Sequence, residues 1–174
     1  MAFIIKNVLY LMILIKMACG CSQSCPRLWL GFGDNCYRLF DTGLAWAAAE
    51  TACNQFNVTN CAGVTTIGHL TSIQSSDEHD FLVEYVQSAL ASSVEAKWKP
   101  QVYIGAEVGS SKTNTSWIDG SDFNYTHWYS TDPNNFPNTK SAIAGGRNSK
   151  GDWVDVYGLK SFQYMCKLPC SENV

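Results

Sequence analysis

The chain has 174 residues, of which 46% are apolar and 16% are charged, and its net charge at pH 7 is -3. This composition excludes an intrinsically disordered chain, which would be poor in apolar residues, and a protein that binds nucleic acid through many phosphate contacts, which would be rich in basic residues. About 150 residues suit a single domain with one core.

The first 20 residues are typical of a secretory signal peptide. Lys6 gives a basic start, residues 8–15 form an uninterrupted apolar stretch, and Gly20 is a small residue at a cleavage spacing. A membrane-spanning helix needs about 20 apolar residues, and Lys6 and Lys16 limit this stretch to fewer. We expect residues 1–20 to be removed and the protein to be secreted without a membrane span; an uncleaved anchor is the alternative.

Two helices are expected in the N-terminal half of the chain. The segment 41–56 repeats an apolar residue every fourth position, which predicts an amphipathic helix. The segment 75–90 begins with Ser75 and Glu78 at the spacing of a capping box and continues with an apolar stripe. Its acidic residues predict a solvated helix face, with acid–base catalysis as the alternative: Asp77, Glu78, Asp80 and Glu84.

The C-terminal half is expected to form strands and loops. Short apolar runs separated by Gly, Asn, Ser and Asp predict strands at 102–106, 116–119, 152–156 and 162–168. A polar segment between them, residues 121–150, is longer than most connections, and loops of this length are usually functional. Helices followed by strands indicate an α+β domain.

Eight cysteines in a secreted chain predict disulfide bonds. No cysteine lies between Cys61 and Cys166, so a bond from the N-terminal group to the last pair would close the domain on itself. Such a long loop contributes about 4 to 5 kcal/mol of stability in the chain-entropy model. A zinc site is the alternative and has little support, because the three histidines are scattered and no paired C-x-x-C spacing occurs.

The order of several short motifs resembles the C-type lectin-like domain family, over residues 25–170. The motifs are C-P-R-L-W at 25–29, C-Y-R-L-F at 36–40, W-A-A-A-E-T-A-C at 46–53, H-L-T-S-I at 69–73, Y-I-G-A at 103–106, D-P-N-N at 132–135, W-V-D at 153–155 and Y-M-C-K at 164–167. The resemblance implies an α+β fold with two helices, small antiparallel sheets and a long ligand-binding loop, stapled by disulfides.

The resemblance also implies a disulfide pattern. It assigns the pairs Cys25–Cys36 and Cys53–Cys166 and leaves Cys61 and Cys170 as the third pair. The family's bond across the long loop is absent, because its two positions fall near Ala142 and Gly158. Cys21 remains for a bond to a second chain, which would give a disulfide-linked dimer, or as a free thiol.

Calcium-dependent members of the family bind sugar through side chains of the long loop and the adjoining strand. Asp132 and Asn134 stand where the family has E-P-N, and Asp155 matches the aspartate of W-N-D. Val154 replaces the asparagine of that motif and offers no oxygen, while Lys140 falls near the next carboxylate ligand. Calcium takes about six to eight oxygens. We therefore expect a degraded calcium site, with the Lys140 ammonium taking the ion's place as a hypothesis.

These residues predict a secreted lectin-like protein that binds carbohydrate or glycoprotein ligands through the long-loop region. The alternative is a calcium-independent lectin-like protein that binds protein partners or serves in an extracellular matrix. The motifs of hydrolases, zinc proteases and dinucleotide-binding proteins are absent, so no enzyme is predicted. Three N-x-S/T sequons predict N-glycosylation of polar loops at Asn57, Asn114 and Asn124.

Overall fold

The structure is a computed structural model of the chain. It describes residues 23–60, 62–90, 101–109, 114–134, 141–145 and 150–172. The predicted signal peptide at 1–20 lies outside the described residues, and so do Cys21, Cys61 and Lys140.

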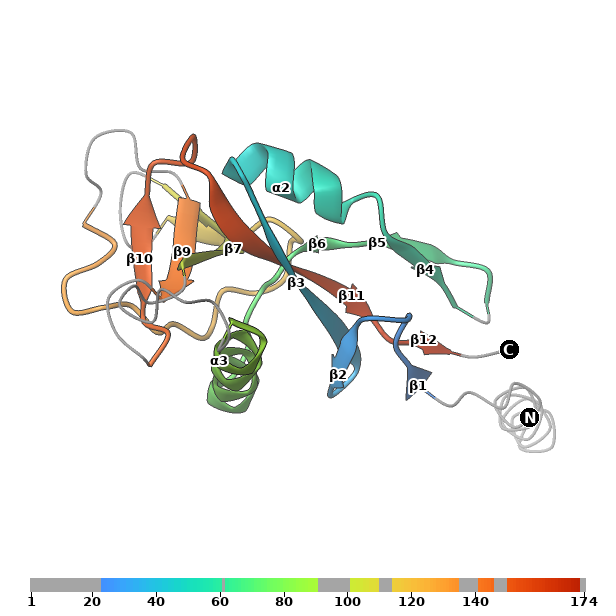
Figure 1. The fold of residues 1–174 in the computed structure, drawn as a ribbon. Coiled ribbons are helices and arrows are strands. Elements are labelled where there is room, and N and C mark those ends of the chain that lie inside the picture. The colour runs from blue at the N-terminus through green and yellow to red at the C-terminus, as the bar shows by residue number, and fades with distance from the viewer. Residues whose placement is uncertain are drawn as a thin grey trace, which may run out of the picture.

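Two helices and twelve strands make up the described part of the chain (Figure 1). In chain order they are β1 (Gln23–Ser24), β2 (Leu30–Phe32), β3 (Asn35–Leu44), α2 (Trp46–Cys53), β4 (Asn57–Thr59), β5 (Thr65–Ile67), β6 (His69–Leu70), α3 (Ser76–Leu90), β7 (Gln101–Val108), β8 (Thr115–Trp117), β9 (Ser141–Gly145), β10 (Trp153–Val156), β11 (Phe162–Pro169) and β12 (Ser171–Glu172). The α+β prediction is confirmed, and so are strands in the four predicted regions.

A central sheet organises the fold. Its strands run in the order β10-β9-β7-β11-β3-β2, with β6 added beside β11 and β8 beside β7. The pairing of β11 with β7 is parallel, and the other pairings of this sheet are antiparallel. Two small sheets complete the fold: β1 pairs with β12, and β4 with β5. In Figure 1, β9 and β10 lie at the end of the molecule opposite to β1 and β12.

Two apolar clusters fill the space beside the sheet, one under each helix. The first contains Ala49 and Cys53 of α2 together with Leu70 and Leu168. The second contains Leu82 of α3 together with three buried aromatic rings, Tyr37, Trp117 and Trp153. Figure 1 shows α2 and α3 on opposite sides of the crossing strands β3 and β11. The large share of Trp and Tyr in the sequence therefore serves the core.

The predicted start of the first helix is wrong. Residues 41–44 continue β3, and α2 begins only at Trp46. The strand extends this far because Leu44 pairs with Phe162 of β11, a partner far away in the sequence. Long-range strand pairing therefore overrides the local helical periodicity of this segment.

The predicted solvated face of the second helix is wrong at Glu78, a buried residue with 4% of its total surface exposed. The predicted helix start is confirmed, since the Glu78 N–H donates to Ser75 Oγ at 3.1 Å. The Glu78 carboxylate, however, accepts from the Gln74 N–H and from Lys167 Nζ rather than facing water. Burial is possible because these donors satisfy the carboxylate.

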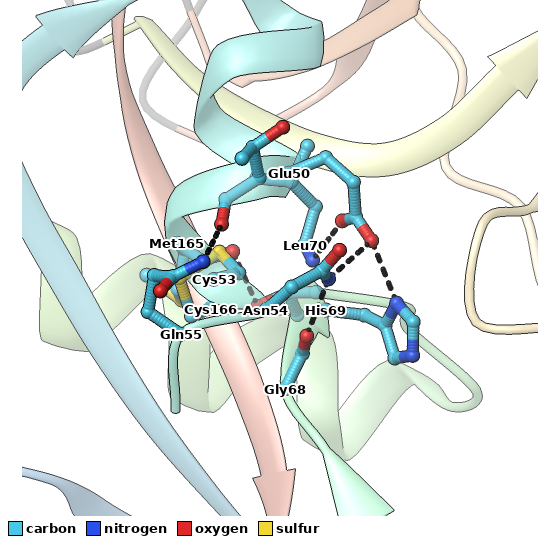
Figure 2. The surroundings of a disulfide bond; sticks show 11 residues. Glu50, Cys53, Asn54, Gln55, Gly68, His69, Leu70, Met165 and Cys166 are labelled. Atoms are coloured by element: carbon cyan, nitrogen blue, oxygen red, sulfur yellow. Dashed lines mark hydrogen bonds and ion pairs between the residues drawn. A yellow bond between two sulfur atoms is a disulfide. The ribbon is translucent and has the colours of Figure 1, made fainter. Parts of the chain in front are cut away.

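Two of the predicted disulfides are confirmed. Cys25 is bonded to Cys36, and Cys53 is bonded to Cys166. The second bond ties α2 to β11 (Figure 2).

The third predicted pair, Cys61–Cys170, is not formed: Cys170 is a free thiol. The Cys170 N–H donates to Asp34 O at 2.8 Å, which turns this residue toward the β2–β3 hairpin. Its sulfur consequently lies 3.5 Å from Cys36 Sγ and 4.0 Å from Cys25 Sγ. This group of three sulfurs is no zinc site, because Cys25 and Cys36 are bonded to each other and are not thiolates.

Glu50 of α2 fastens the helix to β6 beside the Cys53–Cys166 bond, as Figure 2 shows. Its Oε2 accepts from the Leu70 N–H at 2.8 Å. Its Oε1 accepts from Asn54 Nδ2 at 2.8 Å and contacts His69 Nδ1 at 2.7 Å. The start of the H-L-T-S-I segment is thus held on α2 by one carboxylate, beside the disulfide that ties the same helix to β11.

Candidate functional site

Three predicted site residues come together at the outer end of the sheet. The Asn134 N–H donates to Asp155 Oδ1 at 3.0 Å, across 21 positions of sequence. The Asn134 side chain donates through Nδ2 to Asp132 Oδ1 at 2.6 Å. Asn134 is exposed, whereas the two aspartates are buried, with 4% of Asp132 and 8% of Asp155 exposed. The site is therefore a pair of buried carboxylates with a polar amide at the surface.

Backbone hydrogen bonds hold the loop against β10. The Trp153 N–H donates to His127 O at 2.8 Å, and the Tyr129 N–H donates to Trp153 O at 2.9 Å. The Asp132 N–H then donates to Tyr129 O at 2.8 Å, which closes a turn directly before the site. The peptide bond between Asp132 and Pro133 is cis. The turn at Asp132 is thus bonded through Tyr129 to the backbone of Trp153, two residues before Asp155 on β10.

Trp153 is fully buried and forms the floor of the loop. Four aromatic rings meet it edge to face, with these distances between ring centroids: Trp117 at 5.5 Å, Trp128 at 5.6 Å, Tyr125 at 5.8 Å and Phe123 at 6.4 Å. Edge-to-face pairs at such distances add attraction to the burial of apolar area. Trp153 is therefore a core residue beneath the site rather than a surface for stacking a sugar.

Val154 belongs to the core and supplies nothing to the site. Side chains alternate between the two faces of a strand, and Val154 packs into the apolar cluster under α2 while Trp153 packs into the cluster under α3. The sequence predicts that position 154 offers no oxygen to calcium, and a valine packed in the core is consistent with that prediction. Lys140, the other predicted departure, lies outside the described residues.

The side chains of the site have the oxygen ligands that a hard cation prefers, but they are fewer than calcium takes. Calcium prefers carboxylate and amide oxygens, of which it takes about six to eight. Within the described part of the chain, the site offers three side chains with such oxygens: Asp132, Asn134 and Asp155. One oxygen of each aspartate already accepts a hydrogen bond from Asn134. The residues fit a weak calcium site better than a tight one.

The three predicted glycosylation sites occupy exposed positions. Asn57 lies on β4, Asn114 precedes β8, and Asn124 lies in the polar loop before the site. Exposure is what a glycan requires, and the occupancy of these sequons stays a prediction.

The chain belongs to the C-type lectin domain family, because the family model described as "Lectin C-type domain" matches residues 42–168. It is 33% identical over 158 residues to echinoidin of Heliocidaris crassispina, covering 88% of this chain and 100% of echinoidin. It is 30% identical over 175 residues to an alpha-N-acetylgalactosamine-specific lectin of Patiria pectinifera, covering 97% of this chain and 98% of the lectin.

The crystal structure of CEL-IV has the same fold, with a TM-score of 0.73 and 43% identity over 84% of this chain and 95% of CEL-IV. These C-type lectin relatives are non-enzymatic proteins, and the similarity supports a lectin-like function for this chain. Proteins with this fold include calcium-binding members and calcium-independent ones. Among the described residues no helix is both long enough and apolar enough to cross a membrane.

Proposed function

We propose that this chain is a secreted recognition protein that binds carbohydrate or glycoprotein ligands at Asp132, Asn134 and Asp155. The proposal rests on the two hydrogen bonds by which Asn134 joins the two aspartates. Asn134 itself is exposed at the surface. Polar side chains at fixed positions are the groups that bind sugar hydroxyls, because each hydroxyl both donates and accepts. The similarity to an alpha-N-acetylgalactosamine-specific lectin supports a sugar ligand.

Calcium at this site is proposed to bind weakly. The site supplies three side chains with oxygen, and Val154 is committed to the core. Weak extracellular calcium sites have dissociation constants of about 0.1–1 mM, which is the range we propose here. Lys140 is proposed to compensate the charge of Asp132 and Asp155 when calcium is absent. Cys21 is proposed to link two chains, which would let two weak sites act together.

A glycan-binding assay tests this function. The mature, glycosylated protein is applied to surfaces carrying N-acetylgalactosamine-, galactose- or mannose-terminated glycans, with calcium and with a chelator. We expect binding to at least one glycan, and a loss of affinity of about tenfold or more for Asp155→Asn, since a charged hydrogen-bond acceptor in the site becomes neutral. Asp122→Asn is the matched control, because Asp122 is exposed on the same loop.

The outcome separates the proposal from its alternative. Equal binding by the wild type and Asp155→Asn would show that the glycan does not bind at the long loop. Absence of binding to every glycan would favour the second function, calcium-independent binding of a protein partner or a role in an extracellular matrix. The observation in favour of that second function is Val154, because its side chain has no oxygen to offer an ion and packs into the core.

A further inference from the structure

Two histidines pack ring against ring beneath the long loop. The His79 and His127 ring centroids are 4.0 Å apart, and the ring planes are inclined by 30°. His79, on α3, is 1% exposed. His127 precedes the site by five residues, and its ring is held by Asp152 at 2.9 Å and by the Tyr125 hydroxyl at 3.2 Å. The pair thus joins α3 to the loop.

The hydrogen bonds of His79 fix the position of its proton. Its Nε2 lies 2.9 Å from Lys150 O, and a carbonyl only accepts, so Nε2 carries the hydrogen. Its Nδ1 is buried and has no hydrogen-bond partner among the described residues. A second proton on this ring would therefore enter at a buried atom that lacks an acceptor, which is unfavourable.

The loop approaches α3 closely at this point. Gly151, next to Lys150, has φ +72, and a Cβ at this position would lie 2.5 Å from Val83 Cγ2 of α3 and 3.4 Å from the His79 ring. From here the chain runs through Asp152 and Trp153 to Asp155. Both segments that carry the candidate site, one after His127 and one after Lys150, therefore start at the histidine pair.

The charged groups around His79 decide its titration. Burial lowers the pKa of His79 from its ordinary value of 6.5, and a charged His127 lowers it further. The hydrogen bond to Lys150 O and the nearby Asp80 of α3 and Asp152 act in the opposite direction without reversing the shift. Burial raises the pKa of the Tyr125 hydroxyl, which therefore stays neutral in acid.

The sign of the effect follows from linkage. A histidine that is neutral in the closed state, with a lowered pKa there, binds its proton more readily when the structure opens. The closed arrangement of α3 and the loop is therefore fully stable above the ordinary histidine pKa and loses stability as the pH falls below it. Two protonated rings in contact would also repel each other.

We propose that the contact between His79 and His127 holds the loop of residues 127–134 in place and is broken in acid. Protonation of His79 separates the two rings and loosens residues 127–134 from β10, so that acid weakens ligand binding at Asp132, Asn134 and Asp155. The effect on the ligand rests on the proposed function; the loosening is a property of the unliganded chain.

An NMR titration of the unliganded mature protein tests the loosening. Between pH 7.5 and pH 5 the backbone amides of residues 129–134 and 153–155 are expected to change with the same midpoint as the His79 imidazole. His79→Gln, which still offers a donor to Lys150 O, is expected to abolish this transition. His127→Gln is expected to shift the midpoint upward, since it removes the neighbouring charge. Loop amides that do not change with pH, or that change unaltered in His79→Gln, would overturn the proposal.

His69→Gln is the matched control. His69 contacts Glu50 of α2, in the other part of the core, and its replacement is expected to leave the loop transition unchanged. A loop transition lost in this variant as well would assign the effect to the fold as a whole and overturn the proposal.

A second measurement tests the consequence for the ligand. Affinity for an N-acetylgalactosamine-terminated glycan is expected to fall about tenfold between pH 7.5 and pH 5 in the wild type, and less than about twofold in His79→Gln. An equal fall in both proteins would contradict the coupling. If no glycan binds at any pH, the proposed function fails, while the amide titration still decides the loosening.

Discussion

Lys167→Met is expected to lower the free energy of unfolding by about 3–5 kcal/mol, because it leaves a buried carboxylate without its cation. The Lys167 and Glu78 side chains are 11% and 6% exposed, and Nζ lies 2.8 Å from Glu78 Oε1. The ammonium also donates to Ser72 O at 3.1 Å and to Ser72 Oγ at 3.2 Å. Methionine has a similar length and no charge, so the measured loss reports the ion pair and the two hydrogen bonds to Ser72 rather than a cavity.

The rest of the network depends on the charge of Glu78. The Tyr37 hydroxyl donates to Glu78 Oε1, and the Gln74 N–H donates to Oε2 at 2.7 Å. Burial and the Glu78 carboxylate raise the pKa of Tyr37 well above its ordinary value of 10, so the hydroxyl remains a donor. Lys167→Met therefore leaves a carboxylate that keeps two donors and loses its counter-charge.

Urea unfolding monitored by tryptophan fluorescence measures this effect. Lys160→Met is the control, because Lys160 is exposed and its replacement is expected to change stability by less than about 0.5 kcal/mol. The double variant Lys167→Met with Glu78→Gln is expected to recover part of the loss, since no buried charge remains. Equal stability of Lys167→Met and Lys160→Met would show that the ion pair does not support the fold.

Replacing Cys53 and Cys166 together by alanine is expected to lower the free energy of unfolding by about 4 to 5 kcal/mol. The bond closes a loop of 113 residues, so it strongly restricts the unfolded chain. The bond between Cys25 and Cys36 spans only 11 residues, for which the same model gives about 3 kcal/mol. The difference between the two double variants tests the loop-length dependence within a single protein.

Matched denaturation curves of the two double-alanine variants give that comparison. Both variants remove a pair, so neither leaves a new free thiol from the broken bond. A larger loss for the Cys25 and Cys36 variant than for the Cys53 and Cys166 variant would contradict the expectation. The Cys170 thiol lies beside the first bond, and Cys170→Ser in both backgrounds keeps it from forming a new disulfide.

The fold could be predicted from the sequence because each motif has a local cause that the structure retains. Ser75 caps α3, and the cysteines at 53 and 166 pair as the motif order implies. The errors are long-range effects. Leu44 lies in a strand because Phe162 pairs with it, and Glu78 is buried because Lys167, 89 positions away, neutralises it. A helical periodicity cannot show such a partner.

The candidate site could be predicted only in part, because the motifs name residues but do not show long-range contacts. The D-P-N and W-V-D motifs named Asp132, Asn134 and Asp155, and the structure joins them through Asn134. His79 and His127 looked scattered in the sequence, because their contact depends on how α3 packs against the loop. Tyr129 and Trp153 act through backbone groups, and a backbone hydrogen bond leaves no residue-type signal.

NMR mapping of a bound glycan onto the backbone locates the ligand site of this protein. An N-acetylgalactosamine-terminated oligosaccharide, and separately a mannose-terminated one, is added to the mature protein with calcium. We expect one of them to shift the amides of residues 129–134 and 153–156 and to leave those of α2 unchanged. Shifts confined to the β4–β5 hairpin or to α2, with the loop residues unchanged, would contradict a ligand site at Asp132, Asn134 and Asp155.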